Sequence, residues 1–168
     1  MHGKSRRRAL SEFGTQLLEK QKIKFTYGLT ERQLQKYFNE AKQKKGITGD
    51  LLLSALEKRL DNAIYRSGLA SSRVVARQLV NHGHFLVNNK KVNIPSYSVK
   101  TSDIIAIRPK SRSKTMFFDL ANKLKKHEAP AWLMINKKNL DIMVKAEPKN
   151  DDLPKNFNMN VVTAYYSK

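Results

Sequence analysis

Apolar residues recur at helical spacing near the start of the chain and predict two helices there. Ser11 is placed to cap a first helix that runs to about Lys22. Thr30 and Gln33 form a capping-box pattern at the start of a second helix, residues 31–45. The inward face of the second helix is an apolar stripe with steps of three or four residues, formed by Leu34, Tyr37, Phe38 and Ala41.

Two further helices are predicted over residues 50–67 and 71–81, each ended by a glycine, Gly68 and Gly83. Each combines an apolar stripe with a row of polar side chains on another face. The apolar stripes are Leu52, Leu53, Leu56, Leu60, Ala63 and Ile64 in the first, and Val75 and Leu79 in the second. The polar rows are Arg59, Asn62 and Arg66 in the first, and Arg73, Arg77 and Asn81 in the second.

After Gly83 the apolar residues alternate with polar ones, which is typical of strands. Residues 85–94 predict a hairpin with a tight turn at Asn88-Asn89, because asparagine tolerates the left-handed conformation that such turns require. The remaining elements are a strand over 104–107, a helix over about 114–126 and a weaker hairpin from 132–135 and 140–144, followed by an apolar stretch over 161–166. Helices followed by hairpins predict an α+β fold.

The charge of the chain indicates a polyanionic partner. Among 168 residues there are 33 Lys and Arg against 14 Asp and Glu, which gives a net charge of +19. Each third of the chain carries an excess of Lys and Arg, so the basic surface covers the whole molecule rather than a tail. A protein of this kind is expected to be surrounded by phosphate on several sides. A membrane surface is not expected, since neither a broad amphipathic helix nor a lipidation site is evident.

The absence of cysteine narrows the possible chemistry. It excludes disulfides, thiolate metal sites and cysteine nucleophiles within this chain. No cofactor is expected. His82 and His84 could supply two metal ligands, but no further Cys or His lies near them in the sequence, so a structural or phosphate-contacting role is favoured.

Basic side chains gather between residues 57 and 108 on the predicted helix–turn–helix and hairpin. The candidate RNA-binding residues there are Arg59, Arg66, Arg73, Arg77, His82, His84, Lys90, Lys91 and Lys100. A solvated helix face explains any one of these rows alone, but two rows on consecutive helices with a lysine-tipped hairpin favour RNA. Few aromatic residues occur in this segment, so folded RNA is expected rather than a stacked single strand.

The same segment resembles the S4 RNA-binding domain. The matching residues are Arg59-Leu60-Asp61-Asn62, Tyr65-Arg66, Ser71-Ser72-Arg73, Ala76-Arg77-Gln78-Leu79-Val80, His84, Val87-Asn88 and Asp103. The segments Glu19-Lys20-Gln21-Lys22 and Tyr27-Gly28-Leu29-Thr30-Glu31-Arg32-Gln33, with the closing Tyr165-Tyr166-Ser167-Lys168, are similar to the small-subunit ribosomal protein S4 family. Lys20 and Lys22 thereby join the candidate RNA-binding residues.

The resemblance implies a division of the chain into three parts. Residues 1–56 would form a basic arm and a helical ribosomal region. Residues 57–119 would form the S4-type domain, with two helices packed on a small antiparallel sheet. Residues 120–168 would form a C-terminal segment that packs back on the helical region and completes the body.

The resemblance also implies a function and partners. The protein would bind small-subunit (16S-type) rRNA directly and early, nucleate assembly of the subunit body, and affect translational accuracy together with ribosomal protein S5. The basic arm, Lys4, Arg6, Arg7 and Arg8, would line the channel through which mRNA enters, beside ribosomal protein S3. The ribosome would be that of a bacterium, or of an organelle that encodes its own copy, since a start at Met1 would leave no room for a transit peptide. The chain departs from the family in lacking the further residues that commonly precede the position of His2.

Two other classes of protein carry an S4-type domain. Pseudouridine synthases have a catalytic motif that includes Arg-Leu-Asp, and Arg59-Leu60-Asp61 is similar to it. However, Lys58 occupies the position at which those enzymes have glycine, and the helical pattern places these residues in the middle of a helix. The chain is therefore not expected to be an enzyme. A free rRNA-binding assembly or heat-shock factor is the remaining alternative, although such factors lack the segment over 27–33 and the closing Tyr-Tyr-Ser-Lys.

Overall fold

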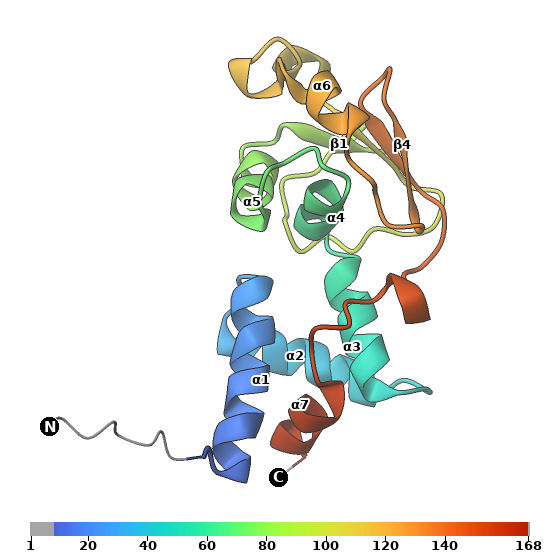
Figure 1. The fold of residues 1–168 in the computed structure, drawn as a ribbon. Coiled ribbons are helices and arrows are strands. Elements are labelled where there is room, and N and C mark those ends of the chain that lie inside the picture. Colours follow the sequence, from blue (N-terminus) through green and yellow to red (C-terminus); the bar gives the residue numbers. More distant parts are fainter. Residues whose placement is uncertain (1–8, 168) are drawn as a thin grey trace, which may run out of the picture.

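The computed structural model describes residues 9–167, which fold into two lobes joined through neighbouring helices. The α-helices are α1 (Glu12–Thr26), α2 (Glu31–Lys42), α3 (Thr48–Glu57), α4 (Leu60–Arg66), α5 (Arg73–Asn81), α6 (Leu120–Lys125) and α7 (Met159–Tyr166). The strands are β1 (Phe85–Val87), β2 (Lys90–Lys91), β3 (Ile104–Ile107), β4 (Leu133–Asn136) and β5 (Asp141–Val144). Short 3-10 turns lie at Pro109–Ser111, Thr115–Phe117 and Asn150–Asp152. Figure 1 shows α1, α2, α3 and α7 in one lobe and the sheet with α4, α5 and α6 in the other.

One antiparallel sheet, in the order β2-β1-β3-β5-β4, organises the second lobe. The predicted hairpin turn is confirmed, with Asn88 at φ 50° and Asn89 at φ 64°. The C-terminal hairpin joins the same sheet, because β3 pairs with β5 and places Ile105 opposite Ile142. This long-range pairing extends the small sheet that the first hairpin predicts.

Each lobe has its own apolar core, and the predicted α+β class is confirmed. The sheet lobe buries twenty residues, among them Leu60, Val80, Phe85, Ile107 and Trp132. The helical lobe buries twelve, among them Ile23, Leu34, Leu56, Phe157 and Val162. Because the burial of apolar area contributes about 25 cal/mol per Å², each lobe has its own driving force for folding.

The C-terminal residues are divided between the two cores. Leu120, Leu124 and the hairpin β4–β5 belong to the sheet core. Only the residues from Leu153 onward enter the helical core, where α7 contacts α1 and α3 as the resemblance implies. The expected segment 120–168 therefore serves both lobes.

The predicted helix over 50–67 is in fact two helices that break at Arg59. This residue has φ −65° and ψ 139°, which is an extended conformation. The break lets the backbone pair with a distant loop: the Leu60 amide donates to the Tyr97 carbonyl at 2.8 Å, and the Val99 amide donates to the Lys58 carbonyl at 2.9 Å. The prediction that Arg59-Leu60-Asp61 lies mid-helix was wrong, because these pairings have no signature in the local sequence.

Other boundaries differ by less. The first helix continues to Thr26, the second ends at Lys42, and the helix expected over 114–126 is a 3-10 turn followed by the six-residue α6. The predicted capping residues Ser11 and Thr30 are confirmed, and Thr30 with Gln33 makes both bonds of a capping box. Of the two serines at the start of the helix predicted over 71–81, Ser72 is the one that caps α5.

Two general properties follow from the part of the chain between residues 9 and 167. None of its helices has the length and apolar character needed to cross a membrane. Within the same residues, no three His, Cys, Asp or Glu side chains cluster as they would around a metal ion.

Candidate nucleic-acid interface

The junction between the lobes holds a buried carboxylate, Glu57, at the end of α3. Its side chain is fully buried and accepts hydrogen bonds from the Tyr27 hydroxyl at 2.5 Å and from Arg66 Nε and Nη2 at 3.0 and 2.9 Å. Asn62 Nδ2 donates a further bond at 3.0 Å. A buried charge is tolerated only where it is paired and hydrogen-bonded, and Glu57 meets that condition. The carboxylate thus ties α1 to α3 and α4.

A second buried carboxylate, Asp61 on α4, holds two arginines. Arg59 donates to it from Nε at 3.1 Å and Nη2 at 3.0 Å, and Arg77 on α5 donates from the same two atoms at 3.1 and 3.0 Å. Arg77 also donates to the carbonyls of Tyr27 at 2.6 Å and Gly28 at 2.5 Å. One guanidinium therefore links α5, α4 and the end of α1.

Arg73 is bonded differently from its three neighbours. Its Nε donates to the Asn62 side-chain oxygen at 2.8 Å. Its guanidinium carbon lies 4.8 Å from the ring centre of Tyr27 and 4.5 Å from that of Tyr65. Arg59, Arg66 and Arg77 each have a carboxylate partner, whereas Arg73 forms no ion pair with any described residue.

The junction shifts the pKa values of Tyr27, Arg59 and Arg66 upward. Burial, reinforced by the neighbouring Glu57 charge, raises the pKa of Tyr27 far above its usual range, so this hydroxyl remains a donor. Burial by itself would lower the pKa of Arg59 and Arg66, but the hydrogen bonds and charges of Asp61 and Glu57 outweigh it and raise both pKa values. Arg59 and Arg66 therefore stay cations.

The positions of Lys20 and Arg59 do not support direct contact with RNA. Lys20 is 4% exposed, its ammonium lies 2.6 Å from Glu31 Oε2, and it sits 4.8 Å from the ring centre of Tyr165. Arg59 is 3% exposed and is held by Asp61. Helical spacing could not reveal these partners, because they come from other elements.

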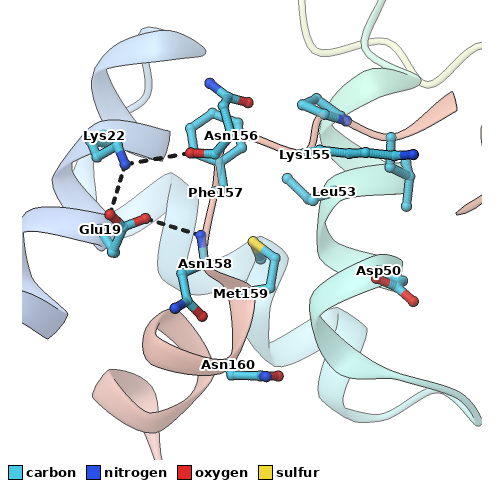
Figure 2. Close-up of a pocket in the computed structure, with 12 residues that line it drawn as sticks. Glu19, Lys22, Asp50, Leu53, Lys155, Asn156, Phe157, Asn158, Met159 and Asn160 are labelled. Carbon is cyan, nitrogen blue, oxygen red and sulfur yellow. Dashed lines mark hydrogen bonds and ion pairs between the residues drawn. The ribbon is translucent and has the colours of Figure 1, made fainter. Parts of the chain in front are cut away.

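Lys22 is exposed, but its ammonium already has partners in the structure. It lies 2.7 Å from Glu19 Oε1 and 3.4 Å from the Asn156 carbonyl (Figure 2). Glu19 also accepts a bond from the Asn158 amide at 3.0 Å. The hydrogen bond from Lys22 lowers the pKa of Glu19 despite partial burial. Lys22 thus helps to hold the strap formed by residues 153–158 against α1.

The candidate histidines separate into a buried and an exposed residue. His84 is buried, and its Nδ1 lies 2.9 Å from the Ser111 hydroxyl. Burial lowers the pKa of His84, and the nearby positive charges of Lys114, His82 and Arg108 lower it further. His84 is therefore neutral at pH 7 and acts as a packing residue, while His82 remains exposed.

The sheet lobe displays a long basic surface. Lys90, Lys91 and Lys100 are exposed, as the sequence predicts. Between residues 78 and 146, no Lys or Arg forms an ion pair with any described carboxylate. Exposed basic residues that the sequence analysis did not select also lie here, namely Lys110, Arg112, Lys114, Lys123, Lys125 and Lys126. The run Lys110-Ser111-Arg112-Ser113-Lys114 was the available signal for part of this set.

The basic arm, Lys4, Arg6, Arg7 and Arg8, lies outside the described residues. Its contact with mRNA stays a prediction, as do the RNA contacts of Arg66, Arg73, Arg77, His82, His84, Lys22, Lys90, Lys91 and Lys100.

Comparison with known proteins gives matches along the whole chain. Residues 58–105 match the family described as the S4 domain, and residues 1–57 match the ribosomal protein S4/S9 N-terminal domain. The chain is 49% identical over 170 residues to the small ribosomal subunit protein uS4 of Chloroflexus aurantiacus, an alignment that covers 99% of this chain and 82% of that protein. The corresponding protein of Borreliella burgdorferi is 46% identical over 169 residues, covering 100% and 81%. That of Chlorobium limicola is 43% identical over 167 residues, covering 99% and 82%.

Proposed function

Since the chain belongs to the small ribosomal subunit protein uS4 family, we infer that it is a structural constituent of the small ribosomal subunit and binds the rRNA of that subunit. It therefore resides in the ribosome. We place that ribosome in a bacterial cytoplasm or in an organelle that encodes its own copy of the protein.

One structural observation supports the rRNA partner above the others. The Lys and Arg side chains between residues 78 and 146 have no described carboxylate within ion-pair distance, in a chain of net charge +19. Uncompensated charge on this scale repels itself, and a polyanion removes the repulsion while counterions are released from its phosphates. Lys90, Lys91 and Lys100 are thus proposed as phosphate contacts.

The arrangement of the lobes favours a binder of folded RNA that acts early in assembly. The arginines of α4 and α5 are fixed by Glu57, Asp61 and Asn62 before any RNA arrives. A rigid basic surface loses little conformational entropy on binding, so it can bind a folded junction without other proteins. We propose on this ground that the protein nucleates assembly of the subunit body.

Two further partners and a role in accuracy are proposed from the family resemblance. The arm of Lys4, Arg6, Arg7 and Arg8 would face incoming mRNA beside ribosomal protein S3. Contact with ribosomal protein S5 would affect accuracy. The first turn of α1 offers a surface for a protein partner, because Phe13 is 53% exposed and its ring lies 5.9 Å from that of Tyr165 on α7.

The alternative of a free assembly or heat-shock factor has no specific observation in its favour. Such a factor would need the S4-type domain alone, whereas residues 1–57 match the ribosomal N-terminal domain. A catalytic role for Arg59-Leu60-Asp61 is also disfavoured, because Asp61 is 2% exposed and is occupied by two arginines.

Sedimentation tests the proposed function. A tagged copy should migrate with small subunits at low magnesium and remain there through moderate salt. Purified protein should bind a small-subunit rRNA fragment with an affinity that falls steeply as salt increases. Recovery only from the soluble pool, or on free tRNA, would remove the ribosomal assignment.

A further inference from the structure

We propose that Arg73, with Arg66 and Lys155, forms a prebuilt site for one backbone phosphate of the rRNA in a groove between the two lobes. The proposal deepens the function inferred above and rests on it. The groove has a volume of about 460 Å³. Its cationic wall is formed by Arg66, Arg73 and Lys155, and its remaining lining includes Thr26, Asp152 and Asn156.

Arg73 is the cation of the groove that forms no ion pair with any described residue. Arg66 is paired with Glu57, and Lys155 with the exposed Asp151 at 3.0 Å. Arg73 is partly buried and has only the neutral Asn62 oxygen and two tyrosine rings as partners. The groove contains one carboxylate, Asp152, and this group accepts a bond from the Lys149 amide at 3.4 Å. Asp152 balances the charge of Arg73 across the groove, but no ion pair joins the two side chains, so Arg73 is the cation of this groove without a directly bonded anion among the described residues.

The atoms of Arg73 that remain available suit a phosphate better than a base. Nε is bonded to Asn62, while Nη1 and Nη2 donate to no described residue. The Tyr27 and Tyr65 rings lie against the guanidinium, so they compete with any base that would stack on it. The open edge offers two parallel N–H groups, which match two phosphate oxygens in a bidentate contact.

The surroundings of Arg73 keep it in place before binding. Tyr27 is 1% exposed and is held by Glu57, and Asn62 is 1% exposed and also bonded to Glu57. A guanidinium fixed in this way gives up little side-chain entropy when it meets a phosphate. The same carboxylate that joins the lobes therefore also orients the proposed phosphate site, through Arg66 directly and through Asn62 for Arg73.

The four arginines on α4, its N-cap and α5 fall into two groups with different partners. Arg59 and Arg77 share Asp61 as their ion-pair partner and hold the lobes together. Arg66 and Arg73 line the groove, and Arg73 has no ion-pair partner among the described residues there. Equal spacing along the helices conceals this difference, which only the partners of each side chain reveal.

The test compares Arg73→Gln with Lys36→Gln, because both remove one positive charge from a helix and Lys36, which pairs with Glu40 on α2, lies outside the groove. Affinity of the full chain for a small-subunit rRNA fragment is measured over a series of KCl concentrations. Arg73→Gln should weaken binding roughly ten-fold or more, by loss of charge-assisted bonds. It should also make the log–log salt slope shallower by about 0.7 to 0.9, the value of one phosphate contact on nucleic-acid calibrations. Lys36→Gln should leave the slope unchanged.

Phosphate ethylation of the RNA supplies the second readout. Ethylating one particular phosphate should impair binding of the wild type and have no further effect on Arg73→Gln. Arg73→Lys, which keeps the charge and is the milder change, should retain the slope but not the full affinity. Thermal unfolding checks that each variant is folded, and Lys155→Gln gives a groove variant on an exposed residue.

The outcomes separate this site from the underlying function. If the wild type binds rRNA but Arg73→Gln keeps its slope and its ethylation pattern, the site is wrong and the ribosomal role stands. If the wild type does not bind small-subunit rRNA, the function itself is lost. Stabilisation of the wild type, but not of Arg73→Gln, by millimolar inorganic phosphate would support the site. If inorganic phosphate stabilises the wild type and Arg73→Gln equally, or neither of them, the result would count against a discrete phosphate site.

Discussion

Asp61 Oδ2 on α4 lies 3.0 Å from Arg77 Nη2 on α5, and that same nitrogen donates to the Tyr27 carbonyl at the end of α1. Two consecutive helices of the sheet lobe are thereby joined to the helical lobe at one point. Glu57 accepts hydrogen bonds from Tyr27 and Arg66 at the same junction, so both buried carboxylates there are paired. The relative position of the lobes is set by specific bonds, since apolar burial alone would allow sliding.

Loss of the Arg77 contacts should loosen the junction. Arg77→Met removes the donors to Asp61 and to the Tyr27 and Gly28 carbonyls. We expect unfolding free energy to fall by about 2 kcal/mol, since part-buried acceptors lose their partners. Hydrogen exchange should quicken at the turn between α1 and α2 more than in the sheet. Equal protection of both regions would contradict the proposed junction.

Glu57→Gln should be among the most destabilising single changes in the chain. It removes the fully buried carboxylate and leaves the partly buried Arg66 guanidinium without its counter-ion, and breaking one side of a buried pair costs about 3 kcal/mol. Urea denaturation measures the loss. The matched control is Glu147→Gln, because the Glu147 side chain pairs with Lys58 and is 51% exposed. This substitution should change the free energy of unfolding by less than about 1 kcal/mol. Similar losses for the two variants would contradict the prediction.

Stability should decrease in mild acid because of His84. Its pKa is lowered from 6.5 in the folded protein, so the unfolded chain binds a proton more readily. The contribution of His84 is thus complete above pH 6.5 and is lost as pH falls below that value towards the lowered pKa. The urea midpoint should fall between neutral pH and mild acid, and less so for His84→Gln. Parallel pH profiles for the two proteins would exclude His84 as the cause.

The basic arm should act on mRNA more than on rRNA. Lys4, Arg6, Arg7 and Arg8 precede the first helix cap, so changing all four to Ala should cost the fold little. Translation of a hairpin-bearing message should slow, while translation of an unstructured message and occupancy of the protein in small subunits stay near normal. Equal slowing on both messages, or loss from subunits, would assign the arm to rRNA anchoring instead.

Local sequence was sufficient to predict most of the secondary structure. Ser11, Thr30 and Ser72 cap helices where expected, and Asn88-Asn89 turns the hairpin. These features depend on side chains that bond to backbone within three residues, or on the conformational preference of one residue. The net charge of +19 likewise predicted a polyanionic partner, because it needs no knowledge of the fold.

Tertiary structure decided which charges are available to that partner. Arg59 and Arg77 fit a basic surface by spacing and Lys20 by the family resemblance, yet Lys20 pairs with Glu31 and both arginines pair with Asp61. Arg77 also bonds two carbonyls just after α1. The helix break at Arg59 and the pairing of β3 with β5 also depend on segments distant in the sequence. Helical periodicity identifies the residues that lie on the same face of a helix. Whether that face meets solvent, a carboxylate or a carbonyl depends on contacts between elements, and these are set only when the chain folds.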